Sequence, residues 1–247
     1  MTDLSGKQVL ITGGGTGVGA DMARGFAAAG ARVVIAGRRS APMEAVADGS
    51  DQIRPVICDV TDETSVRSMF AAAGPCDVVI ANAGAADTAP FGRTTLEQWN
   101  AMMAVNLTGV FLTLREGLNQ FTGWGRLISV ASTAGLKGYG YVSAYTAAKH
   151  GVVGMTRAVA QEVAKKPVTV NALCPGFLDT EMTDRSVANI IDKTGMDEAA
   201  ARKELAKHNP QKRLIQPSEV TAAALWLCGP GSEGINGQAL PIAGGEL

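Results

Sequence analysis

The residues best placed to do chemistry lie in one short stretch, GYGYVSAYTAAKHG at 138–151, which holds all three tyrosines of the chain. Only Tyr145 is followed four residues later by a lysine, Lys149. Residues four apart share one face of a helix, so both side chains can project into one site. A nearby cation favours phenolate, so we expect Lys149 to lower the pKa of Tyr145 from about 10 and to suit it to general acid–base work.

Two further polar residues accompany this pair. Ser132 comes thirteen residues before Tyr145, just past the apolar run RLISVA, where its hydroxyl could hydrogen-bond a substrate oxygen. Asn106 is a polar residue in the otherwise apolar stretch AMMAVNLTGVFL. We therefore predict a catalytic site made of Asn106, Ser132, Tyr145 and Lys149, without a metal ion.

Short apolar runs alternate along the chain with amphipathic segments. The runs lie at 7–12, 32–37, 53–58, 77–82, 126–131, 168–173 and 238–243. The amphipathic segments lie near 18–29, 62–73, 95–118, 143–164 and 217–228. Near-continuous Val/Ile runs are typical of strands buried on both faces, and strand–helix–strand repetition indicates a parallel sheet covered by helices. We predict an α/β fold of Rossmann type over 1–247, a single domain with a doubly wound sheet of about seven strands.

A glycine-rich turn joins the first expected strand to the first expected helix. Gly13, Gly17 and Gly19 form a TGxxxGxG pattern, and Gly15 is an additional glycine. Backbone amides approach a pyrophosphate closely only where no side chain intervenes, and a helix N-terminus adds a favourable dipole. The position between VLIT and an amphipathic helix favours a dinucleotide site over a merely structural turn.

Two arginines follow the second expected strand, in the order Gly37-Arg38-Arg39. Enzymes that prefer NAD usually place an acidic residue near this point, where it accepts a hydrogen bond from the ribose 2′-hydroxyl. Arginine instead pairs with phosphate through a planar fork of donors. We predict a preference for NADP(H), with NAD(H) possible and Arg38 the better candidate; two simply solvated arginines are the alternative.

Composition and charge exclude some classes of partner. The chain has 22 Lys and Arg against 23 Asp and Glu, a formal net charge of −1, so we expect neither nucleic acid nor a membrane surface as partner. The N-terminal stretch lacks the pattern of a signal peptide, and we expect no membrane-spanning helix. The four cysteines form no CxxC pair, which indicates small buried residues in a reduced, cytoplasmic protein.

A long polar segment interrupts the alternation of strands and helices. Residues 181–215, EMTDRSVANIIDKTGMDEAAARKELAKHNPQKRLI, lie between the run at 168–173 and the amphipathic segment at 217–228. Long excursions at the carboxyl side of a sheet often cover a binding site. We predict a helical substrate lid at about 181–215, with a solvated helical decoration as the alternative.

These features together resemble the short-chain dehydrogenase/reductase family. The marks occur in the family's order and span nearly the whole chain: TGGGTGVG at 12–19, CDV at 58–60, ANAG at 81–84, Asn106, Ser132, Tyr145-x-x-x-Lys149 and PGFLDT at 175–180. The resemblance implies an oxidoreductase that transfers a hydride between nicotinamide and a ketone or secondary alcohol. Ala81 departs from the family, which often has a first asparagine there, and we expect the change to affect local hydrogen bonding.

The resemblance also implies a role for each matched position. Tyr145 would protonate the carbonyl oxygen in reduction or act as the base in the reverse direction, and Ser132 would polarise the carbonyl. Lys149 would hold the nicotinamide ribose and lower the pKa of Tyr145, and Asn106 would support a water that relays protons to Lys149. The residues implied at the cofactor are Gly13, Gly15, Thr16, Gly17, Val18, Gly19, Arg38, Arg39, Asp59, Val60, Asn82, Ala83, Gly84, Tyr145, Lys149, Pro175, Gly176, Leu178 and Thr180.

The substrate is less specified than the chemistry. The stretches from Lys149 to Phe177 and from Arg213 to Leu227 resemble the branch of 3-oxoacyl-thioester reductases, 3-hydroxyacyl-CoA dehydrogenases and polyketide ketoreductases. A basic cluster in the lid could meet the phosphate-bearing arm of such substrates, although a solvated helix face is the alternative: Lys203, Lys207, His208, Lys212 and Arg213. The rival hypotheses are an enzyme for a free cyclic ketone, polyol or steroid-like alcohol, and a cofactor-bound scaffold without turnover.

The remaining expectations concern two tyrosines near the site and the oligomeric state of the protein. Tyr139 and Tyr141 lie between Ser132 and Tyr145, and at least one is expected to line the pocket or to pack beneath the lid. The resemblance implies a homotetramer, with a dimer as the alternative. We expect Gly151 and Gly154 to leave one stretch of their helix small enough for the close approach of a partner, and the C-terminal tail to make another contact.

Overall fold

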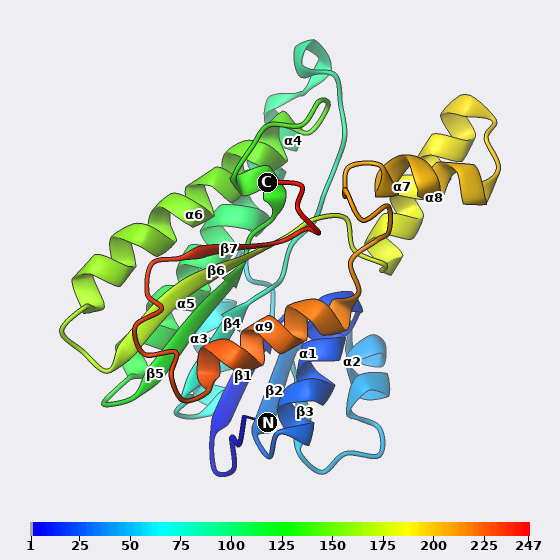
Figure 1. Cartoon of the computed structure of the whole chain (residues 1–247). Helices are drawn as coiled ribbons and strands as arrows, with labels where there is room; N and C mark the ends of the chain where they lie inside the picture. The colour runs from blue at the N-terminus through cyan, green and yellow to red at the C-terminus, as the bar shows by residue number, and fades with distance from the viewer. Residues whose placement is uncertain (1) are drawn as a thin grey trace.

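A computed structural model describes residues 2–247, except the side chain of Arg185. Across this part of the chain, seven strands form one parallel sheet in the order β3-β2-β1-β4-β5-β6-β7 (Figure 1). Their bounds are β1 Gln8–Thr12, β2 Arg32–Gly37, β3 Ile53–Ile57, β4 Val78–Ala81, β5 Gly125–Val130, β6 Val168–Pro175 and β7 Ala239–Ile242. Each strand coincides with a predicted apolar run, so the predicted fold class is confirmed.

Helices cover both faces of the sheet (Figure 1). Successive strand residues alternate between two hydrophobic clusters, since Leu10 packs in one and Ile11 in the other. The first cluster joins the sheet to α3, α5 and α6, and the second joins it to α1, α2 and α9. The bounds of these helices are α1 Gly17–Ala28, α2 Ser40–Ala47, α3 Glu63–Ala73, α5 Gly109–Gln120, α6 Ser143–Val163 and α9 Pro217–Cys228.

The order in which strands are added to the sheet reverses between β1 and β4, and this switch point indicates where a ligand can bind. From β1 the chain builds outward to β2 and β3, and then returns to the other side of β1 with β4. In open α/β sheets, ligands bind outside the carboxyl ends of the strands at such a switch point. The loops after β1, β4, β5 and β6 are therefore the ones that build the site.

The predicted helix at 95–118 is not one continuous helix. It consists of α4, Leu96–Met103, then a wider π-helical segment at Ala104–Thr108, and then α5. A π segment replaces one turn of regular hydrogen bonds and is frequent at functional sites. Here it carries Asn106, the polar residue predicted for the site.

The polar segment at 181–215 forms a helical hairpin, as expected from its composition. Its helices are α7, Glu181–Thr194, and α8, Glu198–Ala206, and they extend from the rest of the molecule (Figure 1). Val187, Ala201 and Leu205 form a small hydrophobic cluster of their own, separate from the two clusters of the sheet. Its function as a lid stays a prediction.

Two remaining expectations concern the glycines of α6 and the cysteines. A Cβ at Gly151 would lie 2.9 Å from Leu107 of the same chain, so this glycine makes room for an internal contact, and its place at a partner surface stays a prediction. Gly154 faces open space. All four cysteines are buried and free, as predicted. Among the described helices, none combines the length and the apolar character needed to cross a membrane.

Candidate active site

The predicted catalytic side chains meet beyond the carboxyl end of β5. Ser132 follows this strand by two residues and begins a short 3₁₀ turn at Thr133–Gly135, where its Oγ accepts a hydrogen bond from the backbone N–H of Ala134 at 3.1 Å. Tyr145 lies in the first turn of α6, with its hydroxyl close enough to Ser132 for that side chain to lower the pKa of the tyrosine. The strand end and the helix start thus bring two hydroxyls, thirteen residues apart in sequence, to one point.

Lys149 lies one turn further along α6 and is buried, with 3% of its surface exposed. Its Nζ donates to the carbonyl oxygen of Val130 at 2.8 Å and lies 5.5 Å from the centre of the Tyr145 ring. Burial lowers the pKa of Lys149 from 10.5 to about 8, because removing the ammonium from water disfavours the charged form, and the nearby Cys174 opposes this shift. The predicted pairing of Tyr145 with Lys149 on one helix face is confirmed.

The expected direction of the Tyr145 pKa is wrong for this structure. Burial raises the pKa of Tyr145 above its ordinary value, the neighbouring Ser132 side chain lowers it, and Cys174 adds a further increase. Lys149 does not offset the burial, because its ammonium points to the carbonyl of Val130. The tyrosine is therefore held as a neutral phenol, the form that can donate a proton.

Asn106 is fully buried, and its amide holds the loop after β4. Its Nδ2 donates to the carbonyl oxygens of Ala85 at 2.9 Å and Met102 at 3.1 Å, while its Oδ1 accepts from the N–H of Ala85 at 3.1 Å. A Cβ at Gly84 would lie 2.9 Å from Asn106 Oδ1 and 3.7 Å from Lys149 Nζ. Asn106, Gly84 and Lys149 are therefore neighbours; the proton-relay role of Asn106 stays a prediction.

The glycine-rich turn has the shape that a phosphate-binding loop requires. Gly13 adopts a positive φ of 68°, and a Cβ there would lie 2.8 Å from the Cα of Ala83. A Cβ at Gly19 would lie 2.2 Å from the carbonyl oxygen of Gly13, closer than any side chain tolerates. These two glycines are thus needed for the close packing of the loop itself. The pocket that Gly15, Thr16 and Gly17 line leaves the start of α1 open to a diphosphate, so the loop fits a dinucleotide.

Thr12, which the sequence reasoning did not select, fastens this loop to the one after β4. Its Oγ1 accepts hydrogen bonds from the N–H groups of Asn82 and Ala83, both at 3.1 Å. Asn82 Nδ2 in turn donates to the carbonyl oxygens of Thr12 at 2.9 Å and Gly13 at 3.2 Å. The Ala81 departure therefore leaves the two loops joined, through the single asparagine that remains. Its position directly before the glycines is the feature of the sequence that could have identified Thr12.

The two arginines after β2 lie at different places. Arg38 lies close enough to Asp59 for its charge to lower the pKa of that carboxyl, together with the stronger hydrogen bonds from Thr61. Arg39 instead lines a pocket of about 440 Å³ beside the glycine-rich turn, which also takes in Gly15, Thr16, Gly17, Ala20, Asp21, Arg24, Pro42, Ala45, Val46, Glu181 and Pro217. Both arginines are exposed and lie at the carboxyl edge.

The residues after β6 approach the glycine-rich turn from the other side. Gly176 directly follows this strand, and its N–H donates to the carbonyl oxygen of Ile242 at 3.0 Å. Thr180 precedes α7, and its Cγ2 would lie 3.4 Å from a Cβ at Gly17. Val60 is buried, and its side chain packs against Gly109. Thr180 therefore lies beside the glycine-rich turn, and the cofactor contacts of the predicted positions stay a prediction.

Comparison with known proteins identifies the family. A model described as short chain dehydrogenase matches residues 7–190 of the chain. The protein belongs to the short-chain dehydrogenase/reductase family. It is therefore an oxidoreductase of the class that acts on hydroxyl and keto groups, as the resemblance in sequence implied.

Curated relatives and solved structures cover the short-chain dehydrogenase over nearly its whole length. It is 33% identical over 252 residues to a D-beta-hydroxybutyrate dehydrogenase of Rhizobium meliloti, covering 97% of this chain and 98% of the relative. A putative ketoacyl reductase of Streptomyces coelicolor is 32% identical over 257 residues, covering 99% and 98%. A crystal structure of an actinorhodin polyketide ketoreductase variant with NADPH matches with a TM-score of 0.91 at 31% identity, covering 100% of this chain and 99% of that one.

Three of the five basic residues predicted to form a cluster in the hairpin are already engaged by other groups of the chain. Arg213 makes two hydrogen bonds to the carboxylate of Glu219, at 2.6 and 2.7 Å. Lys207 pairs with Glu204, and the His208 ring packs at 5.3 Å from that of Phe177. The described contacts include no acidic partner for Lys203 or Lys212 (the latter donates to the Lys207 carbonyl), so these two carry what remains of the predicted cluster.

The two other tyrosines differ in position. Tyr139 lies 5.8 Å from the His208 ring and 6.4 Å from the Phe177 ring, both edge-on, so it packs against the hairpin segment as expected of one tyrosine. Its hydroxyl also donates to Glu246 of the C-terminal tail. Tyr141 is 70% exposed. Glu246 was not selected from the sequence, since nothing local in the tail indicates where its side chain goes.

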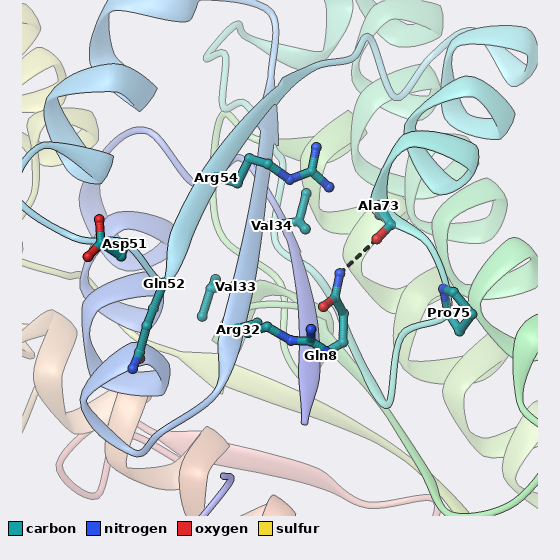
Figure 2. Close-up of a pocket in the computed structure, with 9 residues that line it drawn as sticks. All are labelled: Gln8, Arg32, Val33, Val34, Asp51, Gln52, Arg54, Ala73 and Pro75. Carbon is teal, nitrogen blue, oxygen red and sulfur yellow. Dashed lines mark hydrogen bonds between the residues drawn. The ribbon is translucent and has the colours of Figure 1, made fainter. Parts of the chain in front are cut away.

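A second pocket of about 440 Å³ lies at the opposite edge of the sheet, where the strands begin (Figure 2). Figure 2 shows Gln8, Arg32 and Arg54 on neighbouring strands, with Gln8 donating to the carbonyl oxygen of Ala73. None of the predicted site residues lines this pocket. It is therefore separate from the catalytic groups.

Proposed function

We propose that this enzyme transfers a hydride between NADP(H) and a ketone or secondary alcohol, with a 3-oxoacyl or 3-hydroxyacyl thioester as substrate. The observation that carries the proposal is the meeting of Ser132, Tyr145 and Lys149 beside the glycine-rich turn. The relatives that are named ketoacyl reductases, and the neighbour whose structure contains NADPH, support the choice of substrate and cofactor.

The residues of the chain have separate tasks in this proposal. The Ser132 and Tyr145 hydroxyls hold the substrate oxygen, and Tyr145, kept neutral by burial, gives it a proton during reduction. Lys149 holds the cofactor ribose in this proposal. NADP(H), when bound, supplies or accepts the hydride; the bare turn at Gly13–Gly19 and Arg38 would hold its phosphates.

Arg38→Ala is expected to lower the preference for NADPH over NADH at least tenfold. The guanidinium pairs with the 2′-phosphate that distinguishes the two cofactors, so its loss weakens NADPH binding while leaving NADH unchanged. The measurement is kcat/KM with each cofactor, and Arg32→Ala, an exposed arginine at the opposite edge, is the matched control. An unchanged preference in Arg38→Ala would overturn this assignment.

Replacing Lys203 and Lys212 together by glutamine is expected to raise the KM for acetoacetyl-CoA about three- to tenfold, with no change for a small cyclic ketone. The two ammonium groups attract the phosphates of the CoA arm, which the cyclic ketone lacks. The control exchanges Lys165 and Lys166, exposed residues just after α6, for glutamine. Equal effects on both substrates would exclude a role in binding this arm.

The proposed function is tested by initial rates of NADPH and NADH oxidation with acetoacetyl-CoA and with a cyclic ketone, in wild type and in Tyr145→Phe. Tyr145-dependent turnover of the thioester with NADPH is expected. Turnover of the cyclic ketone alone would support the rival class of free ketones or alcohols. Cofactor binding without turnover of any carbonyl or alcohol would support the non-catalytic scaffold. We further propose a cytoplasmic homotetramer, which a dimeric or monomeric mass in light scattering would exclude.

A further inference from the structure

The C-terminal tail of the chain packs against the segment that follows Ser132 (Figure 1). Glu246 lies in this tail, and its side chain is only 2% exposed. Its Oε1 accepts a hydrogen bond from the Tyr139 hydroxyl at 2.5 Å and forms an ion pair with Lys137 Nζ at 3.0 Å. The Tyr139 hydroxyl also lies 2.7 Å from Oγ1 of Thr133, the residue that directly follows Ser132. A line of contacts therefore leads from the tail to the residue next to the predicted catalytic serine.

The direction of these hydrogen bonds follows from the number of hydrogens. A phenol has one hydrogen to donate, and Tyr139 keeps it, because burial and the bond to Glu246 both raise its pKa. The carboxylate of Glu246, which pairs with a lysine, is the stronger acceptor, so the Tyr139 hydrogen points to it. The Thr133 hydroxyl therefore donates to the phenol oxygen, and this bond holds the Thr133 side chain in one orientation.

The short turn that Thr133 begins contacts both Ser132 and α6. Oγ of Ser132 accepts a hydrogen bond from the N–H of Ala134 in this turn, at 3.1 Å. A Cβ at Gly135, the last residue of the turn, would lie 2.7 Å from the carbonyl oxygen of Lys149. A shift of the turn therefore changes where the Ser132 hydroxyl lies relative to the helix that carries the other catalytic groups.

Packing alone does not explain a carboxylate at this place. Oε2 of Glu246 has no hydrogen-bond partner among the residues that the structure describes, and a buried oxygen without a donor costs stability. The ring of Tyr139 already packs edge-on against the rings of Phe177 and His208, at 6.4 and 5.8 Å. The carboxylate therefore adds what these aromatic contacts lack, which is a fixed direction for the Tyr139 hydroxyl.

We propose that Glu246 and Tyr139 are positioning residues for the reaction, because they hold the turn that places the Ser132 hydroxyl. The inference rests on the proposed function, since it takes Ser132 to hold the carbonyl oxygen beside Tyr145. Neither positioning residue needs to touch the substrate. The carbonyl oxygen gains negative charge in the transition state, so a displaced Ser132 hydroxyl lowers kcat and leaves KM nearly unchanged.

Tyr139→Phe keeps the ring and removes the hydroxyl that connects Glu246 with Thr133. It is expected to lower kcat about tenfold, because a misplacement of about 1 Å can cost up to about a hundredfold in rate. The KM for the ketone and the dissociation constant for NADPH are expected to change less than twofold. Steady-state oxidation of NADPH with acetoacetyl-CoA and with the cyclic ketone measures kcat and KM.

Two substitutions of Glu246 distinguish the loss of its acceptor from the loss of its charge. Glu246→Ala removes the acceptor and is expected to lower kcat about tenfold, as Tyr139→Phe does. Glu246→Gln retains an acceptor oxygen for the Tyr139 hydroxyl, so its kcat is expected to stay within threefold of wild type. Equal losses in Glu246→Ala and Glu246→Gln would show that the hydrogen bond to Tyr139 is not what matters.

The double variant shows whether the two residues act through one connection. Tyr139→Phe combined with Glu246→Ala is expected to lower kcat about tenfold and not a hundredfold, because either substitution alone breaks the same line of contacts. Tyr141→Phe and Glu233→Gln change an exposed tyrosine and an exposed glutamate, and these matched controls are expected to keep kcat within twofold. Additive losses in the double variant, or an unchanged kcat in Tyr139→Phe, would overturn the proposal.

Hydrogen exchange measured by mass spectrometry separates a failure of this inference from a failure of the proposed function. The peptide that spans 131–138 is expected to exchange faster in Tyr139→Phe and Glu246→Ala than in wild type, with or without turnover. Faster exchange with an unchanged kcat would mean that the contacts only stabilise the turn, so the inference fails while the proposed function stands. Faster exchange in a protein that reduces no ketone would mean that the turn is held as inferred but that the proposed reaction is wrong.

Discussion

Tyr145→Phe is expected to lower kcat for carbonyl reduction about a thousandfold, while the dissociation constant for NADPH changes less than threefold. The substitution removes one hydroxyl and keeps the ring that packs at the start of α6. A positioned general acid contributes roughly two to four orders of magnitude to the rate, and Tyr145 places a neutral O–H beside Ser132. Stopped-flow or steady-state oxidation of NADPH measures kcat, and quenching of protein fluorescence measures the affinity.

Tyr141→Phe is the matched control for this prediction. Tyr141 belongs to the same stretch of sequence but is 70% exposed, so the loss of its hydroxyl is expected to change kcat less than twofold. Retention of more than a tenth of the activity by Tyr145→Phe would show that another group supplies the proton.

Lys149→Met is expected to raise the free energy of unfolding by about 2 kcal/mol at pH 7, while abolishing measurable turnover. Burial lowers the pKa of Lys149 from 10.5 to about 8, and a shift of this size corresponds to a stability cost of about 3 kcal/mol below pH 8. Methionine has a similar length and no charge, so the variant avoids this cost. It also lacks the hydrogen bond from Lys149 to Val130, which is worth about 1 kcal/mol, so the net gain in stability is about 2 kcal/mol. Urea unfolding followed by circular dichroism gives both free energies.

The pH dependence of the same pair of proteins gives an independent check. Between about pH 8 and 10.5 the unfolded chain keeps the proton of Lys149 and the folded chain has lost it, so the stability of the wild type rises with pH in this window. Lys149→Met lacks this contribution, and its advantage is expected to disappear by pH 10.5. Lys166→Met, which replaces an exposed lysine, is expected to show neither effect. A destabilised Lys149→Met protein at pH 7 would mean that the buried ammonium has a stabilising partner.

The strands were predictable from the sequence because a strand that is buried on both faces is a nearly continuous run of apolar residues. Runs such as VVIAG and LISV contain only residues that a two-sided core accepts, and each formed a strand. Helix α2 was missed because eight residues with a proline at position 42 leave little periodicity to detect. The π segment at Asn106 was missed because its extra residue per turn depends on the contacts of Ala85 and Met102.

The residues of the site could be predicted from the sequence, but the direction of their pKa shifts could not. The spacing of Tyr145 and Lys149 fixes their common helix face, whereas the pKa of each depends on burial and on the carbonyl of Val130, which no spacing reveals. Glu246 is an extreme case, since its hydrogen-bond partner Tyr139 is 107 residues away. Such contacts are set by how the last strand and its tail fold back over the sheet.

The α7–α8 hairpin has a hydrophobic cluster of its own, so its amino-acid sequence can change independently of the sheet and the helices that cover the sheet. Val187, Ala201 and Leu205 hold the hairpin together without drawing on the packing of the sheet. Insertions, deletions or exchanges within it therefore leave the clusters that position Ser132, Tyr145 and Lys149 intact. The predicted lid can then change in sequence while Ser132, Tyr145 and Lys149 keep their positions, so a lid role for the hairpin would allow a change of substrate without a change in the catalytic groups.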